Sequence, residues 1–110
     1  MKLIDLKDIP LVPVSHDPQI LKQVIIDTGV IPKLNKFSKA IIRKGQTVSS
    51  HRHDNMYEIL FFLTGKGEFS VDGNKVEVSS NQCIIIEPGE VHSIPKVVDD
   101  IELVYFGIEK

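Results

Sequence analysis

Two histidines separated by one residue lie between two glycines, and this stretch limits what the chain can fold into more than any other. His51 and His53 are followed by Glu58, with Gly45 before them and Gly65 after. Side chains alternate between faces along a strand, so the two imidazoles are expected to point the same way. Two imidazoles on one rigid edge favour the binding of one metal ion. If the strand that begins at Glu58 pairs with the strand that carries the histidines, its carboxylate joins them.

Glu58 opens a strongly apolar predicted strand, EILFFL. Leu60 and Phe62 share a face with the carboxylate, because side chains repeat every second residue in a strand. An unpaired carboxylate that faces a core costs several kcal/mol, and a bound cation offsets that cost. The position of Glu58 therefore supports a metal site.

Short strands separated by turns account for most of the chain. Asp72 and Gly73 join two runs of alternating apolar residues, which predicts a hairpin. A break is expected at 65–67 and a turn at Asp99 and Asp100. Without a long helix, the pattern predicts an all-β sandwich or barrel, with a jelly roll as the expected form. The predicted strands cover about residues 20–27, 37–43, 47–53, 58–64, 68–71, 76–78, 82–87, 92–97 and 101–108.

The N-terminal third is less regular. Residues 1–14 are expected to be extended or irregular, because Pro10 and Pro13 each lack a backbone donor. Asp17 followed by Pro18 is typical of a helix start, whereas the β-branched residues that follow favour a strand over about residues 20–27. We favour the strand, which leaves room for one short helical turn near the N-terminus. A single domain over 1–110 is expected, with an arm and strand over 1–36 and the barrel over 37–108.

The spacing G-x5-H-x-H-x4-E-x6-G resembles the first motif of the cupin superfamily. The family's second motif, G-x5-P-x-G-x2-H-x3-N, is matched in part: Gly89 and His92 fit, whereas Asn81, Glu87 and Lys96 depart from it. The first departure is mild, because asparagine accepts a positive φ in a turn. The resemblance spans about residues 40–108 and implies a double-stranded β-helix of two packed antiparallel sheets.

The resemblance also implies a metal site with four ligands, His51, His53, Glu58 and His92. Three imidazoles and one carboxylate suit a single divalent transition metal ion such as Fe, Mn, Co, Ni, Cu or Zn. Four protein ligands leave about two positions of an octahedron open for water, dioxygen or a bidentate substrate. His16 lies outside both motifs and is predicted to be a surface residue.

Two further residues are weaker candidates for catalysis. Tyr105 is expected to point inward and donate a hydrogen bond to a bound ligand, and Glu87 to offer an acid at the barrel mouth. Core packing for the tyrosine and a solvated surface for the glutamate are the alternatives. Cys83, the only cysteine, lies in the apolar run CIII, which predicts a strand buried on both faces and an inert thiol.

Composition excludes several classes of partner. The net charge of −2 gives no basic field for nucleic acid, and the lysines at 33–44 have no aromatic platform beside them. No apolar run approaches the about 18 residues that span a bilayer. A single cysteine and an N-terminus that carries acids indicate a cytoplasmic protein.

The leading functional hypothesis is a metal-dependent enzyme that acts on a small molecule, as a dioxygenase, isomerase, decarboxylase or lyase. The alternative is a non-catalytic cupin that binds or senses a small molecule or a metal chelate. A homodimer through the N-terminal strands and the outer sheet is expected, because EILFFL and CIII are apolar on both faces.

Overall fold

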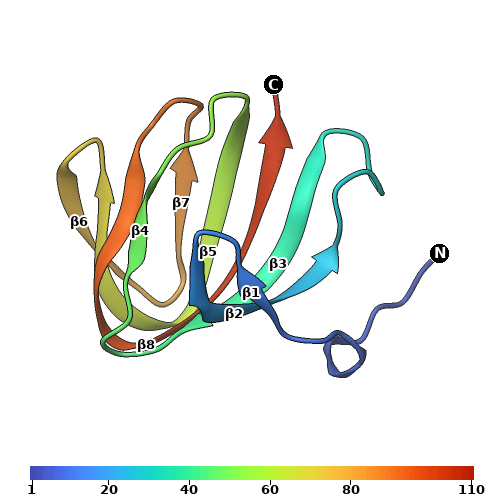
Figure 1. The fold of residues 1–110 in the computed structure, drawn as a ribbon, viewed down its shortest axis with the longest axis horizontal. Coiled ribbons are helices and arrows are strands. Elements are labelled where there is room, and N and C mark those ends of the chain that lie inside the picture. Colours follow the sequence, from blue (N-terminus) through green and yellow to red (C-terminus); the bar gives the residue numbers. More distant parts are fainter.

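The structure, a computed structural model, describes residues 1–110 and is built from antiparallel strands, without an α-helix. One 3-10 turn, η1, precedes them at Leu6–Asp8. Eight strands follow, and together they form a curved sheet (Figure 1). Their bounds are β1 Val12–Val14, β2 Asp17–Ile26, β3 Leu34–Ile42, β4 Val48–His51, β5 Met56–Val71, β6 Asn74–Ser79, β7 Gln82–Ile86 and β8 His92–Glu109. The all-β prediction and the jelly-roll form are confirmed.

The two longest strands, β5 and β8, connect most of the other strands into one sheet. The first part of β5 pairs with β7 and its later part with β6. The first part of β8 pairs with β4 and its later part with β3, while β5 and β8 pair with each other along most of their length. Figure 1 shows both strands bending through the lower part of the fold, so each contributes to both sides of the barrel.

The predicted break at 65–67 and the predicted turn at Asp99 and Asp100 are wrong, because β5 and β8 continue through these positions. The strands bend there instead, with several register shifts between them. A Cβ at Gly65 would collide with the backbone carbonyl oxygen of Asp100, and Gly65 has a φ of +96°. Glycine therefore allows a close crossing of two bent strands and does not end either of them.

The core lies on the inner face of the barrel. Phe62, Phe69 and Ile101 are its largest fully buried side chains, and Phe62 and Leu60 lie on the inner face of β5 as the alternation predicted. Burying such side chains is the main favourable contribution to folding. The complete cluster contains Ile20, Ala40, Ile42, Leu60, Phe62, Phe69, Val78, Ile86, Ile94, Val97, Ile101 and Leu103.

The N-terminal part matches the favoured prediction of a strand, but with different bounds. β2 begins at Asp17, so Asp17 and Pro18 lie in a strand and do not start a helix. The one helical turn lies earlier, at Leu6–Asp8, where the Asp5 side chain accepts a hydrogen bond from the Lys7 amide. Asn81 has a φ of +66°, which agrees with the expectation that asparagine replaces the motif glycine in this turn.

The prediction that β7 is buried on both faces is wrong. Cys83 is exposed, and Ile85 is 65% exposed. Only one face of β7 packs on the core, because β7 pairs with β5 in an outer part of the sheet whose other face is uncovered. No helix in the structure has the length and apolar character needed to cross a membrane.

Candidate metal centre

The four predicted ligands come from three strands and one loop. His51 ends β4 and pairs directly with His92, the first residue of β8. Glu58 lies near the start of β5, and His53 lies in the loop between β4 and β5. The predicted pairing of the histidine strand with the Glu58 strand is wrong, because β4 pairs with β8. The barrel brings the side chains together through β8.

One potential ligand atom from each of these four residues lies within 4.8 Å of the other three. The Nε2 atom of His53 is 3.3 Å from Oε2 of Glu58, and Nε2 of His92 is 3.4 Å from Oε1. The two carboxylate oxygens therefore face two different imidazoles. Such a group could hold a metal ion, since imidazole nitrogens and carboxylate oxygens are common ligands of divalent transition metals.

Backbone carbonyls fix the orientation of two of the imidazoles. Nδ1 of His51 lies 2.8 Å from the carbonyl oxygen of Ser49, and Nδ1 of His92 lies 3.1 Å from that of Glu90. A carbonyl oxygen only accepts hydrogen bonds, so Nδ1 is the protonated nitrogen in both rings. In the neutral tautomer the Nε2 lone pair is then free, which is the arrangement that metal-binding histidines use.

Among the four residues, His92 gives the strongest indication of a bound cation. It is 3% exposed, and its buried Nε2 atom has no hydrogen-bond partner. The nearby Glu58 oxygen does not meet hydrogen-bond geometry, and the Nε2 lone pair of a neutral ring would repel it. A buried polar atom without a partner is unfavourable, and a cation between the nitrogen and the carboxylate would satisfy both. The residues present therefore fit a divalent metal ion.

The ionisation of Glu58 agrees with this arrangement. Burial alone would raise its pKa, but the polar interactions with the neighbouring His53 and His92 rings together outweigh burial and lower the pKa to about 2. Burial lowers the pKa of His51. Burial also disfavours the charged form of His92, but the interactions with Glu58 and Glu90 together outweigh burial and raise the pKa of that ring. The group therefore contains an ionised carboxylate at neutral pH.

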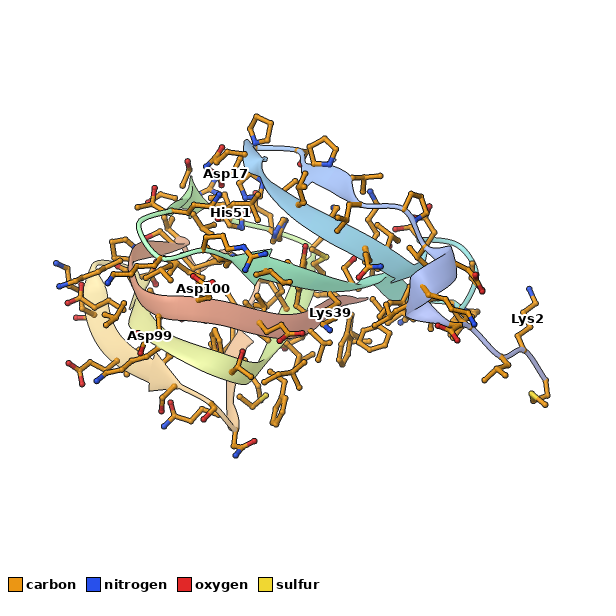
Figure 2. The ribbon with its side chains drawn as sticks, turned by 90° about the horizontal axis from the view of Figure 1, so that it is seen from below. Lys2, Asp17, Lys39, His51, Asp99 and Asp100 are labelled. Atoms are coloured by element: carbon orange, nitrogen blue, oxygen red, sulfur yellow. The ribbon has the colours of Figure 1, made fainter.

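His16 lies beside the group, although sequence reasoning did not connect it with the site. Its ring centroid is 4.1 Å from that of His51, and its Nε2 atom is 3.3 Å from Oδ2 of Asp17. The β1–β2 hairpin brings it there, with Val14 paired to Asp17. Figure 2 shows Asp17 at the start of β2, close to His51. No motif spacing could have indicated this contact, because it depends on how the hairpin folds over β4.

A cavity of about 210 Å³ opens from the four side chains into the barrel, and Tyr105 is one of the residues that line it. Burial and the negative charge of Glu58 raise the pKa of Tyr105 to about 12, so its hydroxyl remains a donor at neutral pH. Glu87 is exposed and does not line this cavity. The structure therefore places only the tyrosine of these two candidates near the metal ligands.

A family model described as a cupin domain matches residues 39–108, which is more than half of the chain. The chain is a cupin. The expected single-domain cupin barrel and the jelly-roll prediction are thus supported by sequence comparison as well as by the fold.

A Thermotoga maritima protein named oxalate-binding protein is 31% identical over 62 residues, which is 56% of this chain and 51% of the relative. The chain thus spans about half the length of that curated relative.

Solved structures show the same fold at lower identity. A crystal structure of a predicted oxalate decarboxylase from T. maritima has a TM-score of 0.89 at 21% identity, over 99% of this chain and 100% of that one. Ectoine synthase from P. lautus has a TM-score of 0.82 at 14% identity, over 99% of this chain and 78% of that one.

Proposed function

We propose that this cupin is a metal-dependent enzyme that acts on a small oxygen-bearing molecule in its barrel. The observation that carries the proposal is the buried Nε2 atom of His92, which has no hydrogen-bond partner and faces the Glu58 carboxylate. His51, His53, Glu58 and His92 would hold one divalent transition metal ion.

When bound, the ion would act as a Lewis acid and polarise a bidentate oxygen ligand at its open positions, or take part in dioxygen chemistry. The residues of the chain would orient the ligand and exclude water. Tyr105 would donate a hydrogen bond from a hydroxyl that stays protonated, and Leu60, Leu103 and Phe69 would supply the apolar wall of the cavity. The raised pKa makes Tyr105 a stable donor and a weak acid, so its role would be to position and polarise the substrate.

The size of the cavity favours a small substrate. A volume of about 210 Å³ lies below the about 300 to 1,000 Å³ that is usual for sites of drug-sized ligands. The names of one curated relative and of one solved structure, both from T. maritima, refer to oxalate, which is consistent with a small acid that chelates the ion. Decarboxylation, isomerisation, elimination and oxygenation of such an acid are the candidate reactions. The first three would draw on a cation that polarises a carbonyl or carboxylate, whereas oxygenation would need a redox-active ion and dioxygen.

Ligand binding without turnover is the second candidate function. The relative named oxalate-binding protein favours it. Substrate-dependent oxygen uptake or product formation by the metal-loaded protein would support the enzyme, whereas tight binding with no turnover would support the binding protein.

Metal content tests the proposed site. Protein purified without chelators should contain about one metal ion per chain by elemental analysis, and His92→Ala and His51→Ala should lose most of it. His16→Ala is the matched control, because His16 contacts His51 but lies outside the ligand group and should retain the ion. Equal metal content in all of these variants would refute the assignment.

We also propose that the protein is a homodimer that covers the outer face of its sheet. Phe61 and Leu63 are 36% and 37% exposed there, and Tyr57 and Ile85 are 41% and 65% exposed. Exposed apolar patches of this kind are typical of interfaces. Light scattering should give twice the mass of one chain, and a single 12.4 kDa species would refute the dimer.

A further inference from the structure

Lys22 is a cation on the inner face of the barrel. It lies in β2 directly opposite Ala40 of β3, and both Ile20 and Ala40 beside it are core residues. The Lys22 side chain is half-buried and lines the same cavity as the metal ligands. Ala40 is small, so the longer lysine side chain has room to lie over it.

Lys22 forms no ion pair in the protein. No carboxylate lies within ion-pair distance of it, whereas Lys39 on the neighbouring strand forms an ion pair with Glu102. Burial and the positive charge of Lys36 lower the pKa of Lys22, and the negative charge of Asp27 only partly opposes them. A cation that is partly removed from water without a partner is unfavourable, and an anionic ligand would correct this.

The charged residues that line the cavity also favour an anionic ligand. One carboxylate, that of Glu58, lines the cavity, and two lysines, Lys22 and Lys36, line it as well. Glu58 is already engaged with His53 and His92. A divalent ion at the four ligands would leave the cavity with excess positive charge at both ends.

The Lys22 end of the cavity is well separated from the Glu58 end. Through the strand register, Lys22 and Ala40 lie in line with Leu103 of β8, whereas Glu58 lies in line with Gly107. Leu103 and Gly107 are four residues apart on β8, which corresponds to about 13 Å along the strand, and the lysine side chain spans part of this distance. The cavity wall between them includes Leu60 and Tyr105. A ligand that reaches both ends must therefore be several atoms long.

We propose that Lys22 binds a second anionic group of the substrate, so that this cupin takes small dianionic acids that chelate the metal at one end and pair with Lys22 at the other. This inference rests on the proposed metal site. It narrows the substrate from any small acid to one with two separated anionic groups.

Matched ligands test it on the Zn²⁺-loaded protein, since Zn²⁺ is redox-inert. Malate and 2-hydroxybutyrate have the same four-carbon 2-hydroxy acid frame. Malate ends in a second carboxylate, whereas 2-hydroxybutyrate ends in a methyl group. The corresponding five-carbon pair is 2-hydroxyglutarate and 2-hydroxyvalerate. In calorimetric titrations we expect at least one diacid to bind about tenfold or more tightly than its monoacid, as for one charge-assisted hydrogen bond. A parallel titration with 3-phosphoglycerate distinguishes a terminal phosphate from a carboxylate.

The variant Lys22→Met should abolish the preference for the second anionic group and change the affinity for 2-hydroxybutyrate less than about threefold. Lys39→Gln is the matched control, because Lys39 forms an ion pair with Glu102 and does not line the cavity, and this variant should keep the preference. The proposal is overturned if no dianion is preferred by the wild type, or if Lys22→Met keeps the preference. Zinc content is measured on every sample. Failure of the wild type to hold zinc refutes the metal site. In zinc-loaded samples, no preference for a dianion in the wild type, or a preference that persists in Lys22→Met, refutes only the role of Lys22.

Discussion

Asp17 connects the N-terminal hairpin to the metal ligands, and its removal gives a prediction that can be worked out in detail. One carboxylate oxygen accepts a hydrogen bond from the Ser49 hydroxyl at 2.6 Å, and the other accepts from the Ser49 amide at 3.0 Å. The carbonyl of Ser49 in turn accepts from Nδ1 of His51 at 2.8 Å. Asp17 is therefore a positioning residue for that ligand.

The expected cost of Asp17→Ala follows from these bonds. Hydrogen bonds to charged groups contribute about 1.5 to 3 kcal/mol each. Asp17 is only 4% exposed, but it lies at the rim with little protein beyond its immediate neighbours, and both of its bonds go to one residue. The two bonds are therefore counted together as one bond near the lower end of this range. We expect a loss of about 2 kcal/mol, which lowers Tm by about 8 °C in a domain of this size.

Urea unfolding of the chelator-treated protein measures this loss. Asp100→Ala is the matched control, because Asp100 also accepts two hydrogen bonds, from the Lys44 amide at 2.7 Å and from Arg43 at 3.1 Å, but is exposed. Water can replace its bonds, so the loss should be much smaller than for Asp17→Ala. Zinc affinity should fall by about tenfold in Asp17→Ala, as for other partners that orient a ligand. A change in stability within about 0.5 kcal/mol for Asp17→Ala, as for a surface substitution, would refute the reasoning.

Three further predictions concern the bend and the ionisable groups. Gly65→Ala should destabilise the protein more in urea unfolding than Gly45→Ala, because both glycines have positive φ but only the Cβ at position 65 meets backbone atoms; equal losses would contradict this. In chelator-treated protein, stability should decline as pH falls from 4.5 towards 2. The folded-state pKa of Glu58 is about 2, below its ordinary 4.5, so the unfolded state binds more protons in this window, and Glu58→Gln should remove part of the decline. Bound metal should be lost as pH falls below about 6, because the histidines must be neutral to bind, and unchanged metal content at pH 5 would count against the ligand set.

The sequence was most informative where one residue type at one spacing has few alternatives. His51, His53, Glu58 and His92 converge as the cupin resemblance implied, although the strand pairing first expected for Glu58 is wrong. Local spacing could not show that β4 pairs with the start of β8, since this pairing depends on the path of the whole barrel.

Local signals failed where tertiary structure decides the outcome. Asp99 and Asp100 have the composition of a turn, but the pairing of β8 with β5 carries the strand through them. The apolar run around Cys83 predicted burial on both faces, whereas one face is uncovered in the single chain. His16 and Lys22 could not be connected with the site, because only the register of β1, β2 and β3 brings them to the cavity.

The most direct test of the central claim is an anomalous difference map from crystals of the protein soaked in Zn²⁺ and measured at the zinc absorption edge. We predict one dominant peak with Nε2 of His92, the other two imidazoles and the Glu58 carboxylate about 2.0 to 2.2 Å away. A dominant peak elsewhere, with Nε2 of His92 still lacking a ligand, would contradict the account.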